Sequence, residues 1–186
     1  KGDYEDPETL LAKARAVDAR LVYLSNPNNP MGSFLVRESI EAMVAELPDG
    51  CLLCLDEAYA DFVDADALPT ISADHPQVIR MRTFSKAFGM AGMRIGYAIT
   101  NAAIADAFNR VRNHFGVNSV GQAAALAALE DVKHQQSVRV AVADSLARIA
   151  EIAAAHKCTA LPTHTNFIAI DCGRDGVFPG HVLSSL

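Results

Sequence analysis

The sequence predicts an α/β fold in which helices flank a mainly parallel β-sheet. Short apolar runs at 21–24, 51–55 and 78–84 have the length of strands, and two segments with helical periodicity, 7–17 and 39–47, alternate with them. Alternation of strands and helices is typical of layered α/β domains. The run at 51–55 is apolar at successive positions, which indicates a strand covered on both faces, as in a parallel sheet.

The first expected element is an amphipathic helix at 7–17, and the strand at 21–24 follows it. This strand ends at Asn26-Pro-Asn-Asn-Pro30, because the two prolines allow neither a helix nor a strand to continue. A second helix at 39–47 is stopped by Pro48-Asp-Gly50, and the apolar strand follows it directly.

The second part of the chain is expected to contain two more strands and then long helices. The strands are predicted at 78–84 and, after a glycine-containing connection, at 94–100. The alanine- and leucine-rich stretch 120–155 favours long helices by intrinsic propensity. After His156 a new unit is expected to begin, with 165–171 as its first strand.

These elements divide the chain into three expected parts. Residues 1–118 are part of a large domain, residues 119–155 are long connecting helices, and residues 156–186 begin a small α+β C-terminal domain. Ligands of open α/β sheets bind outside the carboxyl ends of the strands. Polar clusters follow three of the expected strands, so we expect a site at that edge.

Composition excludes several classes of protein. The chain has 16 basic and 22 acidic residues, a net charge of −6, and no run of like charges, which argues against nucleic-acid binding. It has no apolar stretch long enough to span a membrane and no secretory signal, so a cytoplasmic location is expected. The four cysteines are expected to be free thiols, since Cys51 and Cys54 lie in an apolar run.

No metal site is expected. The six histidines lack close paired spacing. Asp61, Asp64 and Asp66 resemble the start of a calcium loop, but neither the glycine nor the distal glutamate follows, so a solvated acidic loop is expected instead.

A lysine, two hydroxyls and an arginine lie close together in the segment after the strand at 78–84. Thr83, Ser85 and Lys86 come first and Arg94 follows among glycines, which let a backbone approach a ligand closely. A partly desolvated lysine can act as a neutral nucleophile and form an imine with an aldehyde. Arginine and hydroxyls are the partners that a phosphate prefers. The alternative for Lys86 taken alone is a solvated surface residue.

Asp56-Glu-Ala-Tyr59 follows the buried strand at 51–55. A carboxylate at the edge of an apolar sheet needs a cationic partner, and the protonated nitrogen of a pyridine ring is such a partner. Ala58 is small enough to lie against the face of a pyridine ring. Tyr59 can donate a hydrogen bond to a phenolic oxygen carried by that ring. The alternative for Asp56 is a helix cap. The loop 26–32 is the third segment of the expected site. An asparagine side chain in it can reach the same phenolic oxygen as Tyr59, although the loop taken alone indicates only a turn.

In their order, spacing and content, segments 26–32, 56–62 and 83–97 resemble the fold-type I aminotransferases, which depend on pyridoxal 5'-phosphate (PLP). The resemblance is closest to the class II branch that includes histidinol-phosphate aminotransferase. It extends loosely over nearly the whole chain, and it implies the PLP-binding large domain of fold type I with the beginning of the small domain. It also implies a homodimer.

The resemblance implies a role for each matching residue. Lys86 would form the Schiff base with PLP and shuttle a proton, and Asp56 would pair with the pyridine nitrogen. The other cofactor contacts would be to the phenolic oxygen (Asn29, Tyr59) and to the phosphate (Thr83, Ser85, Arg94). The Asn29–Pro30 peptide is expected to be cis.

Three features depart from the family pattern. Met31 stands where the family pattern has a threonine, so the contacts of this loop are expected to differ. Arg112-Asn-His-Phe-Gly-Val-Asn118 differs from the usual Arg-x-Pro-Phe-Asn-Val-Asn, so this segment does not identify the substrate. Family members are about twice as long, so the chain is expected to be a fragment that is inactive alone. The loop that gives amides to the phosphate, the aromatic that stacks on the ring and the arginine for the substrate carboxylate would lie outside it.

The implied activity is transfer of an amino group from an amino acid to a keto acid or to imidazole-acetol phosphate, both of them small-molecule partners. Two alternatives remain open. One is another fold-type I PLP reaction, such as decarboxylation of an amino-acid phosphate or carbon–sulfur lysis, because the same lysine, aspartate and asparagine serve all of these. The other is a non-catalytic, truncated PLP-binding module.

Overall fold

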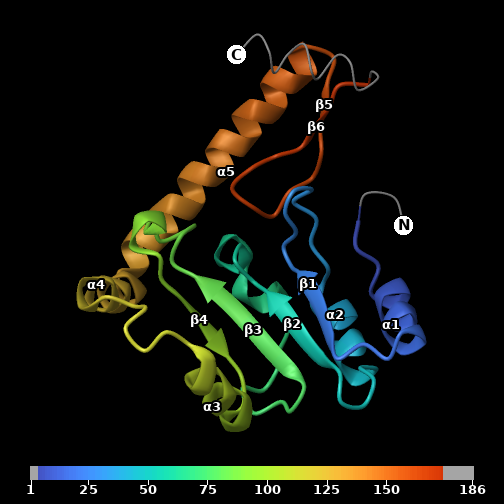
Figure 1. Ribbon diagram of the computed structural model, residues 1–186. Helices are drawn as coiled ribbons and strands as arrows, with labels where there is room; N and C mark the ends of the chain where they lie inside the picture. The colour runs from blue at the N-terminus through green and yellow to red at the C-terminus, as the bar shows by residue number, and fades with distance from the viewer. Residues whose placement is uncertain (1–3, 174–186) are drawn as a thin grey trace.

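The computed structural model describes residues 4–173 and contains a four-stranded sheet in the order β1-β2-β3-β4. Strands β1 (Leu21–Ser25), β2 (Leu52–Asp56) and β3 (Val78–Thr83) are parallel, and β4 (Gly96–Ile99) runs antiparallel to β3 at the edge (Figure 1). The expected mainly parallel sheet is therefore confirmed. The parallel register places the carboxyl ends of β1, β2 and β3 at the same edge.

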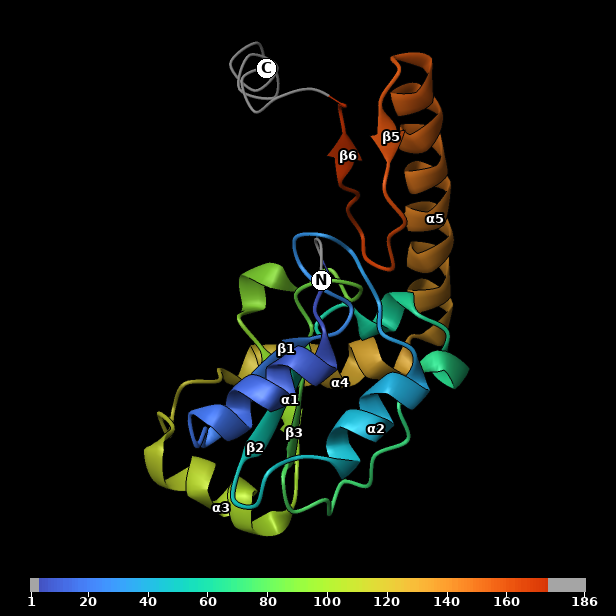
Figure 2. The ribbon, with the colours of Figure 1, turned by 90° about the vertical axis from the view of Figure 1, so that its right-hand side faces the viewer.

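Helices α1 (Pro7–Ala16) and α2 (Arg37–Ala45) lie together on one face of the sheet (Figure 2). Their apolar sides bury Leu11 and Ile40 against Leu24 of β1 and Leu55 of β2. Burial of these side chains supplies the main favourable free energy of this layer. Helix α2 begins and ends two residues earlier than the sequence predicted.

The opposite face of β1 is open in the described part of the chain. Because side chains alternate along a strand, Leu21 and Tyr23 point away from α1 and α2, and both are largely exposed. Cys54 of β2 lies beside Tyr23 in the register and is half-buried, whereas Cys51 is fully buried. None of the cysteines in the described part of the chain forms a disulfide, as expected.

Three further helices follow β4. Helix α3 (Ala102–Val111), which the sequence analysis did not predict, is followed by α4 (Ser119–Glu130) and the long α5 (Val132–Ala155). The expected helical stretch 120–155 is therefore interrupted only at Asp131. The Asp131 side chain accepts a hydrogen bond from the His134 amide and so caps α5 at its first turn.

The segment after α5 forms the short antiparallel pair β5 (Thr159–Ala160) and β6 (Ile170–Asp171) (Figure 1). The predicted strand at 165–171 is wrong over most of its length, because Thr163 and Thr165 both donate hydrogen bonds to the Phe167 carbonyl and close a compact turn. The expected small domain extends to residue 186, and its part beyond residue 173 lies outside the described residues.

The prediction of a strand at 94–100 was also too long. The short 3₁₀ segment η3 (Ala91–Met93) ends at Arg94, which has a left-handed φ of 53°, so the extended conformation begins only after it. Two other 3₁₀ segments, η1 (Ala60–Phe62) and η2 (Ala65–Ala67), follow β2. No helix within residues 4–173 is both long enough and apolar enough to cross a membrane.

Candidate active site

The carboxyl ends of β1, β2 and β3 bring the polar clusters of the sequence to one edge of the sheet, where two adjoining pockets of about 430 and 330 Å³ lie. We call them the first and the second pocket. Asp56, Ala58 and Lys86 line both of them. All eight residues expected at the site line at least one pocket: Asn29, Asp56, Ala58, Tyr59, Thr83, Ser85, Lys86 and Arg94.

The Asp56 carboxylate is held at both oxygens. The Tyr23 hydroxyl donates to Oδ2 at 2.7 Å, and the Ala58 amide donates to Oδ1 at 3.0 Å. Asp56 does not cap a helix, because the next helical segment is η1 and its N-cap is Tyr59, without a side-chain cap bond. The helix-cap alternative is therefore wrong.

Asn29 and Tyr59 meet in the first pocket. The Asn29 Nδ2 atom donates to the Tyr59 hydroxyl at 3.1 Å, so the amide and the phenol reach the same point from two different loops. The Asn29–Pro30 peptide is cis, as the resemblance implied, and Asn26–Pro27 is also cis. Tyr59 is almost completely buried, which fixes its ring.

Lys86 is half-buried and lies at the junction of the two pockets. Its Nζ atom is 5.1 Å from the centroid of the Tyr59 ring, within range of a cation–π interaction. Phe84 and Phe88, on either side of it in the sequence, are buried together with their ring centroids 4.9 Å apart. The lysine turn is thus anchored by a small core, and the alternative of a solvated surface lysine is not supported.

The second pocket contains the hydroxyls and the arginine expected to bind a phosphate. Thr83 Oγ1 accepts a hydrogen bond from the Ser85 amide at 3.0 Å, which shapes the start of the lysine turn. The exposed Arg94 donates through Nη1 to the Ala91 carbonyl at 2.9 Å. One edge of the guanidinium is therefore fixed within its own loop, and the group still lines the pocket beside Thr83 and Ser85.

A buried ion-pair network lies behind the site and was missed in the sequence analysis. Glu57, only 1% exposed, accepts hydrogen bonds from Arg80 at 2.9 Å and from Arg82 at 2.8 Å. Arg82 also contacts Asp61 at 3.3 Å, so that residue belongs to an ion pair and not to a solvated acidic loop. Burial raises the pKa of the Asp61 carboxyl, and the nearby Arg82 opposes this shift.

The network joins the ends of β2 and β3 on the face opposite Asp56. Glu57 follows Asp56 directly, and Arg80 and Arg82 are two residues apart on β3, so alternation places all three on the same face. The Glu57 amide also donates to the Met81 carbonyl at 2.9 Å. The positions of Asp56 on one strand and of Thr83 on the next are therefore cross-linked from behind. The Arg-x-Arg pattern in the strand was the signal that could have revealed this.

The sequence analysis also missed Tyr23, Glu5 and Asn28 in the first pocket. The side-chain amide of Asn28 donates through Nδ2 to Glu5 Oε1 at 2.6 Å. Burial raises the pKa of the Glu5 carboxyl, and the bond from Asn28 acts in the opposite direction. These residues form the wall of the pocket nearest the amino-terminal segment.

The turn at 163–167 packs against the loop that holds Asn29. The His164 amide donates to the Gly32 carbonyl at 2.9 Å, and the His164 ring lies 5.0 Å from the ring of Phe34. Phe167 contacts Tyr59 edge to face at a centroid distance of 5.3 Å. The turn therefore contacts Tyr59 directly and the loop that carries Asn29 through Gly32 and Phe34.

Within residues 4–173, no group of three or more His, Cys, Asp or Glu side chains is arranged to hold a metal ion.

The family model of the class I and II aminotransferases matches residues 1–169 of the chain. Histidinol-phosphate aminotransferase 2 of Pseudomonas aeruginosa is 40% identical over 175 residues, which cover 91% of this chain and 47% of that enzyme. The chain therefore spans about half the length of the curated relatives that it matches.

Solved structures give a similar result. The crystal structure of histidinol-phosphate aminotransferase from Sinorhizobium meliloti in complex with pyridoxal-5'-phosphate superposes with a TM-score of 0.95 and 47% identity, covering 99% of this chain and 51% of that one. A decarboxylase from Sulfurospirillum multivorans superposes with a TM-score of 0.75 and 25% identity, covering 94% and 52%.

Proposed function

Because the chain belongs to the class I and II aminotransferase family, we propose that it forms the cofactor-binding part of a PLP-dependent aminotransferase. The observation that carries this proposal is the convergence of Asp56, the Asn29–Tyr59 pair and Lys86 on two adjoining pockets. These residues come from three different strand ends, and chance placement of turns and caps does not explain their meeting.

The side chains fit PLP group by group. The hydroxyls of Thr83 and Ser85 and the Arg94 guanidinium suit a phosphate, and they line the second pocket together. Asp56 suits a protonated pyridine nitrogen. The Asn29–Tyr59 pair lies in the first pocket with Lys86, where a phenolic oxygen and an aldehyde on neighbouring ring carbons would be received.

When bound, PLP supplies an aldehyde that condenses with amino groups and a protonated ring that accepts the electron pair released at the substrate α-carbon. Asp56 would pair with the ring nitrogen and favour its protonated form, and Ala58 would line the ring pocket. Asn29 and Tyr59 would donate hydrogen bonds to the phenolic oxygen. Lys86 would hold the cofactor through Nζ and would move a proton at the substrate α-carbon.

The test is borohydride reduction of the full-length protein with PLP, followed by peptide mass mapping. We expect the pyridoxyl mass on the peptide that contains Lys86, and no labelling of that kind in Lys86→Ala. Lys133→Ala is the matched control, because Lys133 lies in α5, away from the pockets, and should leave the label in place. A wild-type protein that acquires no label at Lys86 would refute the proposal.

We further propose that the substrates are histidinol phosphate or its keto counterpart imidazole-acetol phosphate, with an amino acid such as glutamate as donor. The 40% and 47% identity to histidinol-phosphate aminotransferases supports this. The assay is conversion of histidinol phosphate in the presence of 2-oxoglutarate by the full-length protein. Absence of turnover with this pair, together with turnover of another amino acid, would assign a different transaminase specificity.

Decarboxylation is the second candidate, because a decarboxylase shares the fold at 25% identity. The two reactions differ in their need for a keto acid. A transaminase forms product only when the acceptor is present, whereas a decarboxylase releases CO₂ without it. Product analysis with and without 2-oxoglutarate therefore separates the two.

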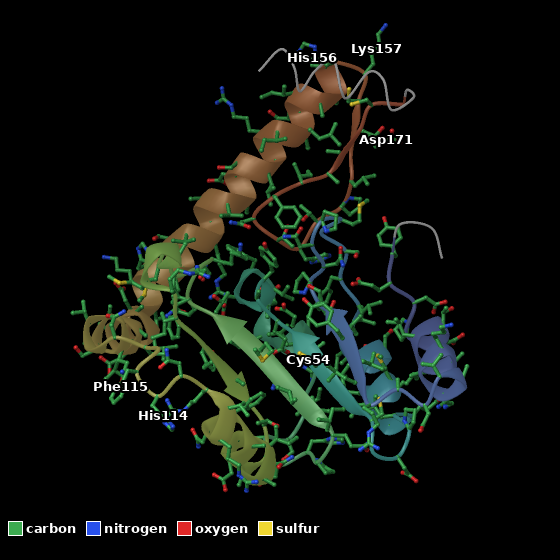
Figure 3. All side chains as sticks on the ribbon, in the orientation of Figure 1. Cys54, His114, Phe115, His156, Lys157 and Asp171 are labelled. Carbon is green, nitrogen blue, oxygen red and sulfur yellow. The ribbon has the colours of Figure 1, made fainter. Side chains whose placement is uncertain are left out.

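We also propose that the full-length protein is a homodimer. Three strongly exposed apolar side chains support this: Val111 at the end of α3, Phe115 in the connection and Val120 in the first turn of α4. Phe115, which Figure 3 labels, is 94% exposed. Exposed apolar patches of this kind mark protein interfaces. Phe115→Asp should shift the mass measured by sedimentation from dimer to monomer. An unchanged dimer would show that this surface is not part of the dimer interface, and a monomeric wild type would refute the proposal.

A further inference from the structure

Tyr23 contacts a central residue of the proposed site, although no motif points to it. Its hydroxyl donates to Asp56 Oδ2 at 2.7 Å, and its side chain lines the first pocket together with Asn29, Tyr59 and Lys86. We propose that Tyr23 is a positioning residue, which fixes the Asp56 carboxylate in the orientation that receives the pyridine nitrogen. This inference rests on the proposed binding of PLP.

The sheet register explains why Tyr23 can reach Asp56. Strands β1 and β2 are parallel, with Tyr23 opposite Cys54 and Ser25 opposite Asp56. Tyr23 therefore lies on the same face as Asp56 and one diagonal step before it, a separation that a long aromatic side chain can bridge. The bond is thus a consequence of the strand register and not of a mobile loop.

The two hydrogen bonds on Asp56 restrict its rotation. The Ala58 amide holds Oδ1 at 3.0 Å and the Tyr23 hydroxyl holds Oδ2, so turning the carboxylate about its Cβ–Cγ bond would break both bonds. Each carboxylate oxygen can accept more than one hydrogen bond, so capacity for the ring nitrogen remains. Without the Tyr23 bond, only the amide of the next turn would orient the group.

Tyr23 can act as a donor throughout the neutral range. Although the side chain of Tyr23 is largely exposed, partial desolvation of its phenol at the pocket wall and its bond to the Asp56 carboxylate raise the pKa of Tyr23 to about 12. Burial and the charge of Asp56 also raise the pKa of the neighbouring Cys54 thiol.

The test compares the dissociation constants of PLP for the full-length wild type and Tyr23→Phe, measured by titrating the apoprotein. The variant removes one oxygen from a largely exposed side chain, so the fold should be retained. A hydrogen bond to a charged group is worth enough for a loss of affinity of about tenfold. An unchanged dissociation constant would overturn the proposal.

Tyr97→Phe is the matched control. Tyr97 pairs with Arg82 in the register, so its ring lies on the face of the sheet opposite Asp56. Its loss of a hydroxyl should leave the PLP dissociation constant at the wild-type value. If Tyr97→Phe weakens PLP as much as Tyr23→Phe does, the effect is a general one and the assignment to Tyr23 fails.

A double-mutant cycle separates positioning from packing. If Tyr23 acts through Asp56, then Tyr23→Phe in an Asp56→Ala background should change PLP affinity by less than about twofold. If the same tenfold loss persists there, Tyr23 acts independently of Asp56 and the proposal is refuted. A wild-type protein that does not bind PLP at all would instead overturn the proposed function, so the two failures are distinguishable.

Discussion

Replacing Glu57 with glutamine tests whether the ion-pair network behind the site holds the sheet together. Glu57 is buried and receives three hydrogen bonds, from Arg80 Nε at 3.0 Å, Arg80 Nη2 at 2.9 Å and Arg82 Nε at 2.8 Å. Glutamine has the same shape but no charge, and its amide would place N–H donors against guanidinium donors. Among the described residues, Asp61, 3.3 Å from Arg82, is the acidic group that would remain paired with these two cations.

The expected loss is large because a buried charge without its partner cannot be solvated. Breaking a buried ion pair by removing one partner costs about 3–5 kcal/mol. The measurement is the free energy of unfolding of the full-length protein in urea, with the m-value checked for constancy. We expect Glu57→Gln to lower this free energy by about 3 kcal/mol or more.

The surface pair Arg15–Glu46 provides the control within the same protein. Its N–O distance of 3.2 Å is similar, but its side chains are 50% and 65% exposed. Exposed pairs contribute at most about 1 kcal/mol, so Glu46→Gln should change the free energy of unfolding by no more than that. If Glu57→Gln lowers the free energy of unfolding by no more than Glu46→Gln does, burial does not make this network more stabilising than a surface ion pair. That result would refute the reasoning.

Three other predictions follow from single contacts. Gly32 and Gly50 both have positive φ angles, of 73° and 72°, but an added Cβ at Gly32 would lie 2.8 Å from Thr163 Cβ and one at Gly50 would meet nothing within 4 Å. Urea denaturation should therefore show that Gly32→Ala costs about 1–3 kcal/mol more than Gly50→Ala, and equal costs would contradict the contact. The pKa of Tyr23 is raised to about 12 in the folded protein, so the folded state keeps a proton that the unfolded state loses from about pH 10 upward. Stability should fall between those values, and less steeply in Tyr23→Phe when melts at pH 9 and 11 are compared; parallel curves would contradict this. Asn118 accepts a hydrogen bond from the Gly121 amide at 2.7 Å at the start of α4, and its replacement by alanine should cost about 1 kcal/mol in the same urea assay, whereas no change would show that the cap is dispensable.

The strands and the pockets were predictable because their signals are local. The apolar run before Asp56 and the prolines around Asn29 fix where strands end, and the parallel arrangement then brings those ends together. The family motifs identified Lys86 and its neighbours as candidate site residues. Each of these residues is recognisable from a few adjacent positions.

The rest depended on contacts between distant positions. Glu57 meets Arg80 and Arg82 only because β2 and β3 are paired, and Tyr23 meets Asp56 only through the register of β1. The segment 165–171 has the composition of a strand, but threonine hydroxyls satisfy the Phe167 carbonyl locally and so compete with pairing. In each case a tertiary or side-chain hydrogen bond decided the outcome.

Helix α3 could have been predicted. Asn101 precedes it and accepts a hydrogen bond from the Ile104 amide, which is the usual signature of a helix start. The segment after it is rich in alanine and ends before the glycine of the α3–α4 connection.

The contact between the turn at 163–167 and the loop around Gly32 joins the segment after α5 to the loop after β1. The Gly32 carbonyl is three residues from Asn29, and Phe167 supports the ring of Tyr59. Displacement of this turn would break the hydrogen bond to Gly32 and the edge-to-face contact with Tyr59. The turn and the first pocket are therefore linked by two contacts that do not pass through the sheet.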